Sequence, residues 1–178
     1  MKSLRIIVAF SILVSMGGCV SRPAFEHLFT RLQSAWKPSP VLDVRDVGRI
    51  LGNQSHVEQV TAYEHEGTKA YQVSFRDVGL DPAVGKTGSL GYMYEEYQSA
   101  EAARFFLDAT LKANHLSPDD AIRTQGGAEL HYFTGGDVIR MVMIRKENRL
   151  VRLKVNPVTS RYSLAEFQRI AAKLAERL

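Results

Sequence analysis

The sequence predicts an α+β fold, in which helices pack on an antiparallel sheet in the element order α-β-β-β-α-β-β-β-α. Short segments alternate apolar and polar residues, as half-buried strands do. They fall into two runs of three, and segments with helical apolar spacing stand before, between and after these runs. Because no helical crossover separates consecutive strands within a run, an antiparallel sheet is favoured over a parallel α/β fold.

The first helix is predicted at "LDVRDVGRILGN", where Asp43 is the N-cap and Gly52 ends the helix. The segments "HVEQVTAYEH" and "KAYQVSFRDV" then form two strands on either side of a turn at 66–68. The second strand is expected to have one buried face, because its large apolar residues stand at alternate positions: Tyr71, Val73 and Phe75.

A glycine-rich loop, "VGLDPAVGKTGSLG", leads into a third strand, "LGYMYEEYQ". Ser99 then caps a helix that is expected to end at Asn114. Its inward face is predicted to carry five residues: Ala103, Phe106, Leu107, Thr110 and Leu111.

Three further strands are predicted at "AELHYFT", "VIRMVMIR" and "RLVRLKVN", and a tight turn at 146–148 joins the last two. The final helix begins after Ser163, and Glu166 three residues later predicts a capping box. A chain of 178 residues is long enough for one sizeable core. We therefore expect a single α+β globular domain at 41–178.

Residues 1–18 have the layout of an export signal. Lys2 and Arg5 form a basic start, and an apolar run continues to Met16 before two glycines. This run is shorter than the ~20 residues that a membrane-spanning helix needs. A buried N-terminal helix is the alternative, but such a helix should be amphipathic, whereas this run is apolar on nearly every side.

The only cysteine of the chain follows this segment directly. The sequence "MGGC" at 16–19 resembles the lipobox of bacterial lipoproteins, with Met16 where leucine is usual. The resemblance implies cleavage after Gly18, a diacylglycerol thioether on Cys19, and acylation of the new amino group with a chain such as palmitate. Because Val20 is not aspartate, it also implies the periplasmic face of the outer membrane in a Gram-negative host.

Residues 19–40 are predicted to be a lipidated tether that contains a short helix and ends at the prolines of "KPSP". The chain carries a net charge of +4, but Lys2 and Arg5 contribute two of these charges and lie in the segment that is removed. The remaining excess is too small to indicate nucleic-acid binding. With Cys19 acylated, the expected partners are the membrane and a protein of the cell envelope.

No catalytic or metal-binding pattern emerges from the sequence. The segment "VGKTG" approaches a phosphate-binding loop, but Leu80 stands where that motif requires its first glycine. His56 and Glu58 share a strand face without an identifiable third ligand, and G-x-S-x-G is absent. We therefore expect no enzymatic activity, no cofactor and no metal.

The C-terminal hairpin is the one place where charge is patterned. Arg140, Arg152 and Lys154 are predicted to form a small basic ladder on one sheet face. Such a ladder either protects an outer strand from aggregation or binds an anionic ligand or partner.

The predicted element order resembles the PsbP-like architecture of several extracytoplasmic lipoproteins and sensor domains. Together with the anchor, the sequence favours a non-enzymatic binding or interaction module, such as an accessory or immunity lipoprotein of an envelope machine or toxin. The alternative is a small-molecule sensor or enzyme with a pocket between the sheet and the helix at 99–113. Tyr92 and Tyr94 are the expected lining of that pocket.

Overall fold

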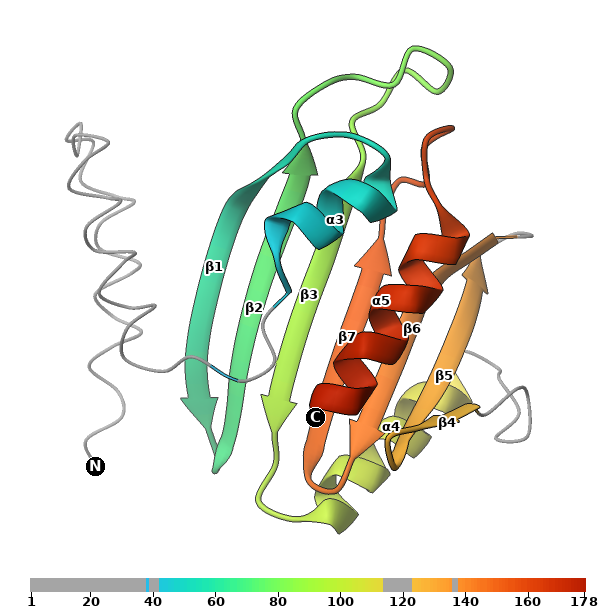
Figure 1. The fold of residues 1–178 in the computed structure, drawn as a ribbon. Coiled ribbons are helices and arrows are strands. Elements are labelled where there is room, and N and C mark those ends of the chain that lie inside the picture. Colours follow the sequence, from blue (N-terminus) through green and yellow to red (C-terminus); the bar gives the residue numbers. More distant parts are fainter. Residues whose placement is uncertain (1–37, 39–41, 114–122, 136–137) are drawn as a thin grey trace, which may run out of the picture. The chain divides into compact units, whose positions relative to one another are not determined.

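The computed structural model describes residues 38, 42–113, 123–135 and 138–178. The expected signal peptide, Cys19 and the expected tether at 19–40 lie outside the described residues, except for Pro38. The described residues form an α+β fold with a seven-stranded antiparallel sheet and three helices (Figure 1). This agrees with the predicted fold class and element order, with one additional strand.

The elements follow one another as helix, three strands, helix, four strands, helix. Their bounds are α3 Val44–Leu51, β1 Ser55–His65, β2 Thr68–Asp77, β3 Ser89–Glu96, α4 Ala100–Ala113, β4 Arg123–Gln125, β5 Ala128–Gly135, β6 Val138–Lys146, β7 Arg149–Val155 and α5 Leu164–Arg177.

The strand order in the sheet is β1-β2-β3-β7-β6-β5-β4. The β3–β7 pair therefore joins the two runs at the middle of the sheet, with Leu90 opposite Val155 and Glu96 opposite Arg149. The additional strand β4 has three exposed residues, "RTQ", and pairs only with β5. It was missed because three polar residues carry no apolar alternation.

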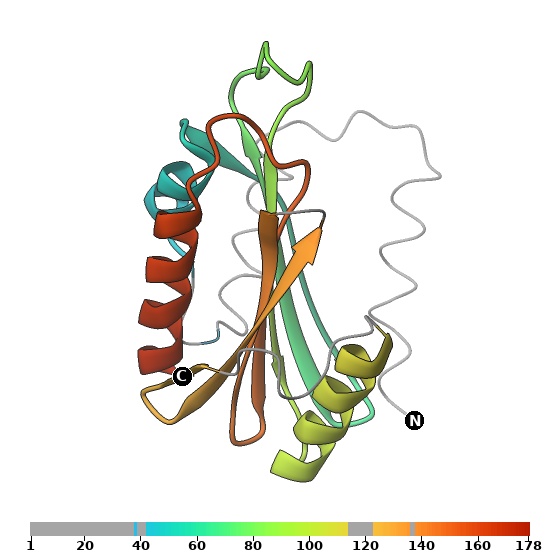
Figure 2. The ribbon, with the colours of Figure 1, turned by 90° about the vertical axis from the view of Figure 1, so that its right-hand side faces the viewer.

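Helices α3 and α5 cover one face of the sheet, and α4 lies against the other (Figure 2). We call these the α3/α5 face and the α4 face. The α3/α5 face holds the larger core, because alternate residues of the central strands are apolar there. Its sheet residues include Phe75, Leu90, Tyr92, Val142, Leu153 and Val155.

The predicted residues cap the N-termini of α3 and α5, but the predicted capping box of α5 is incomplete. Asp43 accepts a hydrogen bond from the backbone N–H of Arg45, and Gly52 ends α3 with φ 72°. Ser163 accepts from the N–H of Glu166, but the N–H of Ser163 donates to the carbonyl of Ile50. The hydrogen bond that would complete a capping box is therefore replaced by a contact that ties α5 to α3.

The smaller core lies beneath α4. Leu107 and Leu111 pack there against Phe133, Met143 and Leu150. The α4 helix contacts mainly β6 and β7. The opposite half of the same sheet face, on β1, β2 and β3, is therefore left to solvent by the described helices.

Tyr92 and Tyr94 do not line a pocket under α4. Both belong to the α3/α5 core, and Tyr92 is completely buried. The alternation of strand side chains fixes this outcome, because residues that pack with Phe75 and Leu90 on one face cannot also face α4. The expected pocket between the sheet and the helix at 99–113 is therefore not formed by these tyrosines.

Candidate functional site

The uncovered half of the α4 face is the candidate functional site. Register places Gln72, Met93 and Arg152 in one row across β2, β3 and β7, and Ser74, Gly91 and Lys154 in the next row. Gln72 and Lys154 are exposed and the others, apart from Gly91, are half-buried side chains. The surface is therefore mostly polar, unlike the buried α3/α5 face.

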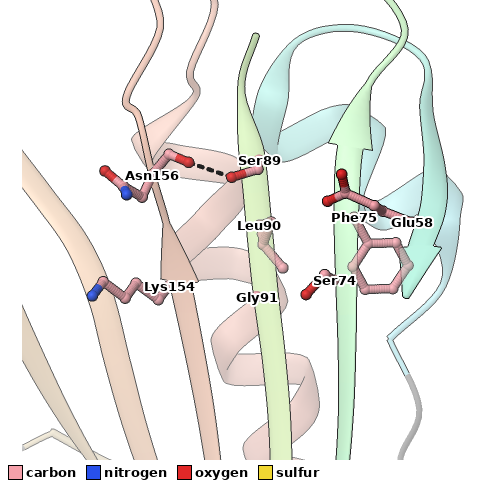
Figure 3. Close-up of a pocket in the computed structure, with 8 residues that line it drawn as sticks. All are labelled: Glu58, Ser74, Phe75, Ser89, Leu90, Gly91, Lys154 and Asn156. Atoms are coloured by element: carbon pink, nitrogen blue, oxygen red, sulfur yellow. Dashed lines mark hydrogen bonds between the residues drawn. The ribbon is translucent and has the colours of Figure 1, made fainter. Parts of the chain in front are cut away.

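A groove of about 240 Å³ lies on this surface (Figure 3). Its floor is at Gly91, where an added Cβ would meet only the carbonyl oxygen of Lys154, at 3.9 Å. The missing side chain at Gly91 thus opens the groove between β2 and β7. The lining residues are Glu58, Ser74, Phe75, Ser89, Leu90, Gly91, Lys154 and Asn156.

The two charged residues that line the groove differ in their partners. The Glu58 carboxylate lies 2.7 Å from the guanidinium of Arg76, so its charge is neutralised within the protein. Lys154 is exposed on the other side of Gly91, and among the described residues no carboxylate lies within ion-pair distance of its ammonium group. The groove therefore presents one available positive charge.

Arg152 stands on the same face as Lys154, two residues earlier on β7, and is more constrained. Its guanidinium contacts the sulfur of Met93 at 2.6 Å and lies near the buried Glu95 carboxyl. Burial raises the pKa of Glu95, and the charge of Arg152 and the hydroxyl of Tyr97 oppose this rise. Arg152 therefore has an electrostatic partner within the protein, the Glu95 carboxyl.

Arg140 does not continue the predicted ladder. The β6–β7 register places Met141 opposite Lys154 and Met143 opposite Arg152. Arg140 lies before the first of these pairs, next to a register shift between β5 and β6. The structure therefore brings Arg152 and Lys154 together on one face, with methionines as their β6 neighbours.

A second polar cluster, at the edge of α4, was not anticipated from the sequence. Glu129 accepts hydrogen bonds from Arg145 at 2.9 Å and Arg104 at 3.3 Å, so it joins α4 to β5 and β6. The Nε2 atom of His131 lies 3.6 Å from the same carboxylate, and burial lowers the pKa of this imidazole. The sequence signal for this burial is strand alternation. His131 stands two residues before the buried Phe133 and therefore shares its face of β5.

The remaining sequence motifs lie in a loop or at exposed strand positions. The "VGKTG" segment lies in the loop between β2 and β3, and a strand rather than a helix follows it. His56 is exposed, and Glu58 is bound to Arg76. Within the described part of the chain, no group of three or more His, Cys, Asp or Glu residues could hold a metal ion.

None of the helices in the described ranges is both long enough and apolar enough to cross a membrane. Comparisons with family models, with curated proteins and with solved structures found no match to this chain.

Proposed function

We propose that this chain is a lipid-anchored, non-enzymatic binding module of the cell envelope. In this proposal, acyl chains at Cys19 hold it in the outer membrane of a Gram-negative host, and the domain faces the periplasm. The observation that carries the binding role is the open floor at Gly91 with the exposed Lys154 at the border of the groove. The support for the anchor is the sequence of residues 1–19.

The groove favours a protein partner over an enclosed small molecule. Small-molecule pockets typically have volumes of roughly 300–1,000 Å³. The groove is smaller, at about 240 Å³, and lies on a sheet face whose neighbouring residues are polar and accessible. We infer that it receives one acidic side chain of a larger partner surface, with Lys154 as the matching cation.

The anchor is tested by mass spectrometry of the chain extracted from membranes. The expected mature protein begins at Cys19 and carries the mass of a diacylglycerol group and an amide-linked acyl chain. A Cys19→Ser variant should keep its N-terminal segment and lose these additions. An unmodified cysteine in the membrane fraction would contradict the anchor.

The binding face is tested by cross-linking and affinity capture from detergent-solubilised envelopes. Lys154→Glu should abolish capture of a stoichiometric protein, because it would place a second carboxylate opposite the acidic side chain of the partner. Lys112→Glu is the matched control, since this exposed lysine lies on α4 and outside the groove. Equal capture by both variants would remove Lys154 from the interface.

A further inference from the structure

The loop between β2 and β3, residues 78–88, carries several exposed apolar side chains. It projects beyond the end of the sheet (Figure 1). Three large apolar side chains are exposed within seven residues: Val78 by 65%, Leu80 by 60% and Val84 by 43%. Phe105 is more exposed, at 78%, but stands alone on α4. Single exposed apolar residues are common, whereas a cluster of them indicates a contact surface.

The loop has a defined conformation, because a buried carboxylate holds it to a distant segment of the chain. Asp81 is 1% exposed. Its Oδ2 atom accepts hydrogen bonds from the backbone N–H and the hydroxyl of Ser160, at 2.6 and 2.7 Å. The guanidinium of Arg161 donates to the carbonyl of Gly79 at 3.2 Å. Two adjacent residues before α5 therefore fix the loop.

The base of the loop is also a polar, buried structure. Asp77 is 2% exposed and lies 3.5 Å from the guanidinium of Arg161. The N–H of Asp77 donates to the carbonyl of Gly88, and the N–H of Val78 donates to Gln54. The exposed apolar side chains are thus presented on a fixed backbone and not on a chain that can fold them inward.

Three backbone N–H groups at the tip of the loop have hydrogen-bond partners within the loop. Asp81 donates its N–H to the carbonyl of Lys86, and Gly85 donates to the carbonyl of Asp81. The N–H of Ala83 donates to the Asp81 carboxylate at 2.8 Å, and Pro82 has no N–H. These bonds leave fewer backbone donors to be transferred from water when the tip contacts a lipid interface.

The charge of the loop also suits a lipid surface. Lys86 and Asp81 are its only ionisable residues, and only Lys86 is exposed. Anionic lipid headgroups attract a lysine near the membrane surface and would repel an exposed carboxylate. A protein pocket would also accept apolar side chains, but the exposed Lys86 beside them is the feature that matches an anionic lipid surface.

We propose that residues 78–88 insert their apolar side chains into the interfacial layer of a lipid bilayer, as a second membrane contact of the domain. This inference rests on the proposed function in one respect, namely that the anchor at Cys19 keeps the domain beside the bilayer. The chain from Cys19 to Leu42 can span about 75 Å at full extension. That exceeds the ~35 Å length of the longest strand, β1, so the loop can reach the membrane.

The test places a fluorescent probe on the loop of the full-length, acylated chain. In Val84→Cys the introduced thiol is the only one free for labelling, because Cys19 is acylated. The protein is reconstituted into vesicles of phosphatidylethanolamine and phosphatidylglycerol. Insertion predicts a blue shift of the probe, loss of most iodide quenching, and quenching by lipids that carry a quencher near the headgroup. The matched control is Lys112→Cys on α4, which should show none of these changes.

Two further variants test the contributions of the positive charge and of the apolar area of the loop. Lys86→Gln, carried in the labelled protein, should lower the ratio of inserted to exposed probe about fivefold on anionic vesicles. The same variant should have no effect on phosphatidylcholine vesicles. Leu80→Ser should reduce the blue shift on both kinds of vesicle, because it removes apolar area from the inserted loop.

The outcomes separate this inference from the anchor. If the chain does not float with the vesicles, and Cys19 also takes up label, the anchor fails. If the chain floats with Cys19 acylated while the Val84→Cys probe stays fully open to iodide, the loop does not insert and the inference is overturned. Protection of the probe in native envelopes but not in pure lipid vesicles would also overturn it, since it would identify a protein pocket as the binding site.

Discussion

The two faces of the sheet differ in how completely they are covered. The α3/α5 face is closed by two helices over an apolar core that includes Phe167, Ile170 and Leu174 from α5. The α4 face is closed only near β6 and β7, where Leu107 packs on Met143 and Leu150. The first face therefore supplies most of the stability, and the described helices leave the β1–β3 half of the second face uncovered.

The largest loss of stability is expected from a cavity in the α3/α5 core. Phe167 is completely buried, so Phe167→Ala should lower the free energy of unfolding by about 3–5 kcal/mol. Urea denaturation of the purified chain measures this loss. Phe105→Ala is the control, because that ring is 78% exposed and its removal should change stability little. Equal losses for the two variants would contradict the assignment of the main core.

A smaller loss is expected beneath α4. Leu107 is completely buried, but the buried cluster around it is smaller than the α3/α5 core. Leu107→Ala should therefore cost about 2–3 kcal/mol, at the lower end of the range for buried leucines. The same denaturation experiment measures it. A loss larger than that of Phe167→Ala would reverse the ranking of the two faces.

The pH dependence of stability should report the buried imidazole on the α4 face. Burial lowers the pKa of His131 below its unfolded value, so the folded state binds fewer protons. Stability should therefore be highest above the unfolded value of about 6.5 and fall as the pH drops through the folded pKa. His131→Gln should flatten this slope in urea titrations between about pH 7 and pH 5.

The control for this experiment is His65→Gln, because 76% of the His65 side chain is exposed. This variant should keep the slope of the parent protein. A slope that is unchanged in His131→Gln would show that other groups set the pH dependence in this range.

The smallest effect on stability is expected in the open groove. A Cβ at Gly91 meets no close neighbour, and replacing a strand glycine by alanine is favourable by roughly 0.5–1 kcal/mol. Gly91→Ala should thus leave stability unchanged or slightly raised while it narrows the groove and weakens capture of the partner. A clear loss of stability would show that the groove floor belongs to the core.

Much of the fold was predictable because its signals are local. The alternation of Tyr71, Val73 and Phe75 identified a strand with one buried face, and all three are buried in the α3/α5 core. Asp43 and Ser163 identified two helix starts. Strand β4 carried no such signal and gains its structure only from pairing with β5.

The candidate site was predictable only in part. Alternation correctly placed Arg152 and Lys154 on one face of β7, but it could not show which residues of β6 lie opposite them. The β6–β7 register places Met141 and Met143 there, and Arg140 falls outside this row. Which residues of two strands lie opposite each other depends on their pairing, and neither strand encodes it alone.

The sequence by itself determined the α+β class and most element boundaries, because periodicity and capping are properties of neighbouring residues. It also supplied the expectation of a lipid anchor at Cys19. Only the tertiary structure decided which sheet face each helix covers. That choice buried Tyr92 under α3 and α5, and left Lys154 and Gly91 open. The physical reason is that coverage depends on contacts between distant segments, which no local pattern encodes.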